Sequence, residues 1–394
     1  NIADREVQPP WWEQKLWGLY DATKVAGNLR HCPTIAYSGE NDKQVQSSDI
    51  MAEHMAKEGL ELTHIIGPGM GHAFDDGSKD EIERQLKPIV EKGRDLTPRS
   101  IEFATYTLRY NRIGWVRIDG LEHHWERAEV RADVVDDCRI TVETENISAL
   151  TLEFLAGHSL LDPGSDVQLE INGTRLSGGT VSHDGQWSVS LLSAGGKWSV
   201  DVAEGLRKVH GVQGPIDDAF MDSFVMVTPT GSPMMGDGVT EWLRDEQRDA
   251  AYQWAMQFRG EPRVRSDNQV SDQNHQDHNL ILWGDPGSNA ILGKIADALP
   301  IQWDRESIRV ADIAYSSDKH VPVLIYPNPI NPQRYVVVNS GFTFAQNGSM
   351  SNATQTPKLP DWAILDIGVP AADRILSGVV DCDFFDEEWK LTAK

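Results

Sequence analysis

The sequence is poor in cysteine, in long apolar runs and in basic residues. Its three cysteines, Cys32, Cys138 and Cys382, are far apart among 394 residues, which excludes a disulfide scaffold and a cysteine-rich zinc module. No apolar run approaches the roughly 18 residues of a membrane-spanning helix. Lys and Arg total 36 against 60 Asp and Glu, a formal net charge of −24. Because no basic stripe could neutralise phosphates, we expect neither nucleic acid nor a membrane surface as a partner.

The remaining composition is that of an ordinary globular protein of two or three domains. The acidity fits a soluble protein in a salty or extracellular setting, such as a bacterial periplasm. The chain starts at Asn1 and no signal-like apolar segment follows. We therefore expect a fragment or processed product, and we leave its compartment and oligomeric state open.

Residues 1–97 show alternating helix and strand patterns. Residues 11–30 have apolar side chains near helical spacing, and further helices are expected over 46–58 and 79–93. Short apolar stretches at 34–40 and 62–67 are typical of buried parallel strands. The order α-β-α-β-α predicts half of a doubly wound sheet.

Residues 98–214 predict a second domain, a β-sandwich of about eight short strands. Asn172-Gly173, between two alternating segments, is the strongest hairpin signal in the chain. Trp187 and Trp198 occupy alternating positions, which favours a place in the core over an exposed surface for binding sugars.

Residues 215–394 predict a third, α/β domain. We expect strands at 222–231 and 280–285, a long helix over 239–258, a polar loop over 266–279 and a helix over 288–299 capped by Ser288. The overall fold class expected is thus α/β plus all-β.

Two residues of the first segment could act together in catalysis. Asp42 follows the strand TIAYSGE, and His72 lies in the glycine-flanked loop PGMGHAF after the next strand. The carboxyl ends of parallel strands meet at one edge of a sheet. A carboxylate there can orient a histidine and leave its other ring nitrogen free to act as a base.

The segment TIAYSGENDKQV, a helix and HIIGPGMGHAF together resemble the C-terminal half of the α/β-hydrolase fold. The similarity is greatest to prolyl-oligopeptidase (S9)-like peptidases and their esterase relatives. It covers about residues 10–95. The resemblance implies that Asp42 is the acid and His72 the base of a Ser-His-Asp triad, and that the substrate is a peptide or an ester, with no cofactor and no metal.

The nucleophile of that family is missing from the sequence. It should lie in a G-x-S-x-G turn before the acid, but no such motif occurs, and Ser38 is the one serine that precedes Asp42. Ser159, in Gly157-His158-Ser159, lacks the second glycine and comes after His72. We expect the serine and the oxyanion hole to lie upstream of Asn1, so that this chain alone is inactive.

Two other groups in the sequence are weaker candidates for a site. His275, Asp277 and His278 could bind a metal but are expected to form a solvated loop, and the turn at 284–288 could bind an anion but is expected to be a strand–helix connection. The alternative to a hydrolase is a non-catalytic module whose β-domain contacts polysaccharide or protein.

Overall fold

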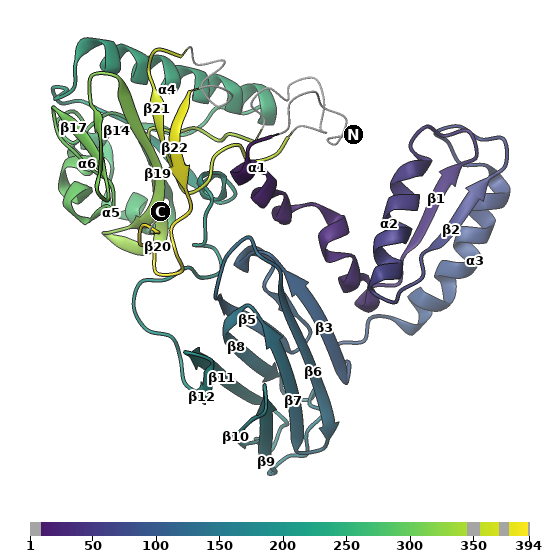
Figure 1. Cartoon of the computed structure of the whole chain (residues 1–394). Helices are drawn as coiled ribbons and strands as arrows, with labels where there is room; N and C mark the ends of the chain where they lie inside the picture. The colour runs from purple at the N-terminus through teal and green to yellow at the C-terminus, as the bar shows by residue number, and fades with distance from the viewer. Residues whose placement is uncertain (1–8, 345–354, 370–377, 393–394) are drawn as a thin grey trace. The chain divides into compact units, whose positions relative to one another are not determined.

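The computed structural model describes residues 9–344, 355–369 and 378–392. The chain forms two compact units, Gly18–Ala203 and Asn1–Trp17 with Glu204–Lys394 (Figure 1). These limits differ from the three expected segments, because the first α/β elements and the β-sandwich fall in one unit. Mixed helix and strand content agrees with an α/β plus β-rich protein. Among the described residues, no helix has the length and hydropathy to cross a membrane.

The helix expected over 11–30 is not continuous. It is replaced by α1 (Trp11–Leu16), the 3₁₀ helix η2 (Trp17–Leu19) and the 3₁₀ helix η3 (Ala22–His31). Asp21 has an extended backbone, and its side chain accepts the Thr23 N–H and starts the new turn. Trp12 and Leu16 instead pack within the unit that holds Glu204–Lys394.

A small α/β segment follows η3. Strands β1 (Ile35–Gly39) and β2 (Thr63–Gly67) are parallel, with Gly39 opposite Gly67, and helix α2 (Val45–Lys57) connects them. Helix α3 (Asp76–Lys92) comes next, capped by Asp75, whose side chain accepts the Ser78 N–H. The parallel order agrees with the sequence pattern, although the sheet has only these two strands among the residues that the structure describes.

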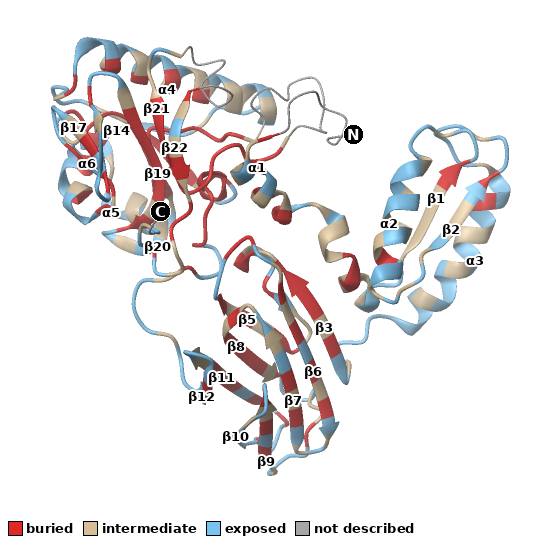
Figure 2. Ribbon diagram, in the orientation of Figure 1, coloured by how far each residue is buried: buried red, intermediate tan, exposed pale blue. Residues whose placement is uncertain are grey.

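The β-sandwich of the same unit has two five-stranded sheets that share one core. Figure 2 shows buried and exposed residues alternating along its strands. Asn172 and Gly173 both have positive φ, 46° and 77°, and join β9 to β10 as the hairpin signal predicts. In chain order the elements are β3 (Ser100–Thr105), η4 (Leu108–Tyr110), β4 (Arg112–Ile113), β5 (Val116–Leu121), β6 (Ala128–Asp136), β7 (Arg139–Glu145), β8 (Ile147–Phe154), β9 (Asp166–Ile171), β10 (Thr174–Thr180), β11 (Trp187–Ala194) and β12 (Lys197–Val200).

The other unit is built on a seven-stranded sheet of order β14-β13-β15-β20-β19-β21-β22. Strands β14, β13, β15 and β20 are mutually parallel, and the rest pair antiparallel. A separate three-stranded sheet, β16-β17-β18, completes it. The elements are η5 (Ile216–Phe220), β13 (Phe224–Thr228), α4 (Asp237–Phe258), β14 (Val264–Ser266), η6 (Asp267–Gln269), α5 (Asp272–Asp277), β15 (Asn279–Leu282), α6 (Ala290–Ile295), η7 (Ala296–Ala298), β16 (Gln302–Trp303), β17 (Ser307–Val310), β18 (Ile313–Ser316), β19 (His320–Asn328), β20 (Asn331–Val338), β21 (Trp362–Asp366) and β22 (Val379–Asp383).

Two local predictions in this unit are wrong. The loop expected over 266–279 contains η6 and α5, because Ser271 and Asn274 form a reciprocal capping box that starts a helical turn. Helix α6 is capped by Asn289, whose side chain accepts the N–H groups of Ile291 and Leu292. Ser288 is instead held by Asp285, which accepts its N–H.

Candidate functional site

The candidate site lies where the chain leaves the carboxyl ends of β1 and β2. The two loops are joined by backbone bonds: Asn41 N–H donates to the Met70 carbonyl over 2.8 Å, and Glu40 N–H to the Gly67 carbonyl over 2.9 Å. Gly39 allows this approach, since a Cβ there would lie 2.1 Å from the Gly71 carbonyl oxygen. A larger residue would push the loops apart.

Asp42 and His72 are brought together by these loops. His72 Nδ1 lies 2.9 Å from Asp42 Oδ2, and the other Asp42 oxygen accepts the Gln44 N–H over 2.9 Å. The Asp42 side chain is 11% exposed and that of His72 78%. The Asp42 carboxylate is therefore fixed by the Gln44 N–H at the start of α2, while the His72 imidazole extends into solvent.

The surroundings of Asp42 favour its ionised form. The Gln44 N–H and then the His72 ring lower the pKa of Asp42, against a smaller opposing effect of burial. No Lys or Arg among the described residues forms an ion pair with it, so its charge is directed at the histidine.

The loop that carries His72 is fixed by contacts both before and after this residue along the chain. The Tyr37 hydroxyl donates to the Ala73 carbonyl over 2.9 Å, and the Tyr37 and Phe74 rings stack with centroids 4.2 Å apart. On the other side, Glu40 Oε2 accepts the Gly69 N–H over 2.7 Å. The sequence signals for Asp42 and His72 gave no sign of these supporting contacts, which join residues from both strands.

The second ring nitrogen of His72, Nε2, has no hydrogen-bond partner within the described parts of the chain. The serines considered from the sequence are engaged elsewhere. Ser38 is buried and lies 3.0 Å from His64 Nε2, across the paired strands. Ser159 Oγ accepts the Leu161 N–H over 3.0 Å, which is a turn contact.

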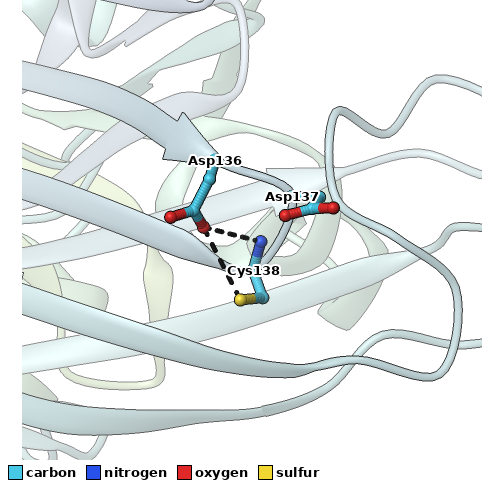
Figure 3. A group of neighbouring side chains, drawn as sticks. All are labelled: Asp136, Asp137 and Cys138. Atoms are coloured by element: carbon cyan, nitrogen blue, oxygen red, sulfur yellow. Dashed lines mark hydrogen bonds between the residues drawn. The ribbon is translucent and has the colours of Figure 1, made fainter.

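A group with metal-ligating atoms lies at the β6–β7 turn, where Asp136, Asp137 and Cys138 converge (Figure 3). Asp136 accepts the Cys138 N–H and forms an ion pair with Arg139 at 3.0 Å. Burial and the Asp136 carboxylate raise the pKa of the Cys138 thiol. Since metals bind the thiolate, these contacts oppose metal binding.

The histidines considered as metal ligands have separate partners. His278 Nδ1 lies 2.7 Å from Ser223 Oγ, whereas His275 Nδ1 faces the Asn328 amide at 3.4 Å. Burial lowers the pKa of His275. The two do not form a metal-ligating group with Asp277 in the part of the chain that the structure describes.

The tryptophans of the β-sandwich belong to its core. Trp115, Trp125, Trp187 and Trp198 are all 2–4% exposed, as expected for Trp187 and Trp198 from their alternating positions. None of these rings offers a stacking surface for a sugar.

No protein-family model, no curated protein and no solved structure matches this chain.

Proposed function

We propose that Asp42 and His72 are the acid and the histidine of a serine hydrolase that cleaves peptide or ester bonds by acyl transfer. The domain would be the C-terminal half of an α/β-hydrolase fold of the S9-like type, followed by the β-sandwich and the second α/β region. The observation that carries the proposal is the 2.9 Å contact between His72 Nδ1 and Asp42 Oδ2 at the carboxyl edge of parallel strands.

The chemistry assigned to each residue follows from that contact. The ionised Asp42 accepts a hydrogen bond from the Nδ1–H of His72, which leaves the lone pair on Nε2 to act as the base. Nε2 would take the proton of a serine hydroxyl as that oxygen attacks the carbonyl carbon, and would return it to the leaving group. Asp42 stays ionised throughout and stabilises the imidazolium.

The serine of this proposal has to come from outside the 394 residues, because the sequence has no G-x-S-x-G motif. The test therefore uses the longer open reading frame around this chain. We expect it to encode a G-x-S-x-G turn before Asn1 and its product to hydrolyse p-nitrophenyl acetate or a peptide p-nitroanilide.

Variants of the longer protein decide the roles. Asp42→Asn should lower kcat by about 10⁴-fold, and His72→Ala by at least about 10³-fold. Asp76→Asn is the matched control, since Asp76 lies at the start of α3 with its side chain 96% exposed. Unchanged hydrolysis in His72→Ala would contradict the proposal.

A further inference from the structure

A second candidate site lies in the other unit, at the carboxyl ends of β13 and β15. These parallel strands are neighbours, but the chain leaves them in opposite directions: β13 leads through α4 to β14 on one side, and β15 leads on toward β20 on the other. A crevice forms where the strand order reverses in this way, and open α/β sheets bind ligands there.

The expected crevice is present as a cavity of about 250 Å³. Its walls come from three elements: the loop after β13, with Pro229 and Gly231; the loop after β15, with Trp283 and Asp285; and helix α4, with Arg244 and Gln247. This volume is just below the range of about 300–1,000 Å³ that is typical of ligand pockets, so the cavity suits a small molecule and not a polymer.

The floor of the cavity is a network that joins the two loops. The buried Asp285 carboxylate accepts the N–H groups of Gly287 and Ser288 from its own loop, at 2.9 and 2.8 Å, and of Met234 and Met235 from the other, at 3.1 and 3.2 Å. Four amide donors thus compensate the Asp285 charge. The site is therefore formed before any ligand binds.

The loops also approach each other directly. The Gly231 N–H donates to the Ser288 carbonyl over 2.8 Å, and a Cβ on Gly231 would lie 2.8 Å from the Gly287 carbonyl oxygen. Asp267, after β14, accepts the Thr230 hydroxyl and the Ala290 N–H at 2.6 and 2.7 Å. The carboxyl ends of β14, β13 and β15 are in this way held as one rigid edge.

The wall formed by α4 supplies positive charge and free donors. Arg244 and Gln247 are three residues apart and share a helix face. Among the described residues no carboxylate pairs with Arg244, whereas Arg248 on the same helix pairs with Asp245. An unpaired guanidinium beside a preformed cavity is the group expected to recognise an oxyanion.

We propose that this cavity binds a small oxyanion-bearing molecule, a phosphate or a carboxylate, through the Arg244 guanidinium with Gln247 as a neutral donor. The site is independent of Asp42 and His72, which lie in the other unit. Its ligand class follows from the unpaired positive charge of Arg244 on the α4 wall of the cavity.

The test is isothermal titration calorimetry of the full chain with inorganic phosphate and, separately, with malonate, both against sodium chloride of equal ionic strength. We expect saturable binding of at least one anion. The anion with the higher affinity shows whether the ligand carries a phosphate or a carboxylate. Arg244→Gln should weaken that binding at least tenfold, and Arg244→Lys should weaken it less.

Arg248→Gln is the matched control, because it removes one arginine from the same helix but does not line the cavity. It should leave the affinity unchanged. The proposal is overturned if neither anion binds the wild-type chain beyond the chloride control, or if Arg244→Gln and Arg248→Gln weaken binding equally. Since Arg244 is exposed, the circular dichroism spectrum of Arg244→Gln should match that of the wild type.

Discussion

His72 Nδ1 and Asp42 Oδ2 are 2.9 Å apart, yet the histidine side chain is 78% exposed and the aspartate 11%. The acid is thus fixed by the protein, through the Gln44 N–H, and the histidine is fixed mainly by the acid and by its own loop. This asymmetry means that changes at Asp42 should affect the position of His72 more than the reverse.

The first prediction concerns the titration of Asp42. Its pKa is lowered first by the Gln44 N–H and second by His72, so in His72→Ala the pKa should rise but stay below the ordinary value of about 4. Carbon-13 NMR of the carboxyl group measures this directly. A pKa at or above the ordinary value in His72→Ala would contradict the prediction, because it would mean that burial outweighs the Gln44 N–H.

The sign of the effect on stability follows from the same shift. A carboxyl whose pKa is lower in the folded state stabilises the fold above its unfolded pKa, and this contribution is lost as the pH falls through the folded pKa. Wild type should therefore lose more stability than Asp42→Asn on acidification from neutral pH. Urea unfolding of the two proteins at several pH values provides the comparison.

The second prediction is that a fluorophosphonate probe does not label this chain. Such probes react with an accessible serine that a base activates. Ser38 lies 3.0 Å from His64 Nε2 but is buried, and Ser159 Oγ accepts a turn N–H and has no histidine contact among the described residues. Mass spectrometry after incubation checks this, with a known serine hydrolase as positive control. Labelling of Ser159 would contradict the assignment of the missing nucleophile.

Local patterns predicted the elements around the candidate site because their contacts are local. Strand β1, helix α2 and strand β2 follow each other directly, and the hairpin at Asn172-Gly173 is set by two backbone conformations. The pairing of Asp42 with His72 depends only on two adjacent strands being parallel, which short apolar stretches joined by a helix indicate.

Contacts between distant segments could not be predicted in this way. The helix expected over 11–30 is interrupted at the extended Asp21, and the part before it makes a contact that no local pattern shows: the Trp12 indole N–H donates to the Lys358 carbonyl, far along the sequence. Likewise, no sequence motif around Arg244 marks it as a ligand-binding residue. It becomes a candidate because the order β14-β13-β15 places α4 beside the loop after β15.

The third prediction concerns the core of the β-sandwich. Trp187 is 4% exposed, its indole N–H donates to the Gly178 carbonyl over 2.9 Å, and it packs against Phe154. Trp187→Ala should cost about 3–5 kcal/mol of unfolding free energy. Val200→Ala is the control, since Val200 is 51% exposed, and should change it by less than about 0.5 kcal/mol. Urea denaturation measures both, and similar costs for the two variants would contradict the core assignment.

The fourth prediction is an order of thiol reactivity. Cys32 is exposed, Cys138 half-buried and Cys382 buried, and burial followed by the Asp136 carboxylate raises the pKa of Cys138. At mildly alkaline pH one thiol, Cys32, should react with a disulfide reagent at least about tenfold faster than the others. Cys32→Ser should remove the fast phase of the reaction, and Asp136→Asn should increase the rate at which Cys138 reacts. A fast phase that persists in Cys32→Ser would contradict this order.

The last prediction is that the segment with β1, α2, β2 and α3 opens more easily than the β-sandwich of the same unit. Met55 is the one buried apolar side chain in residues 33–97, all of which the structure describes, and Ile66, Phe74 and Val90 are 44%, 53% and 74% exposed. A two-stranded sheet is marginally stable alone, and local opening is easiest where few apolar contacts are buried.

The amides of β1 and β2 should therefore exchange with deuterium faster than those of β6 and β8. The free energy of local opening should be lower for β1 and β2 by a few kcal/mol. Limited proteolysis should cut within residues 1–95 before it cuts the sandwich. Equal protection of β1 and β8 would contradict this prediction, and would mean that the contacts of α2 with η3 stabilise the α/β segment as strongly as a core of its own.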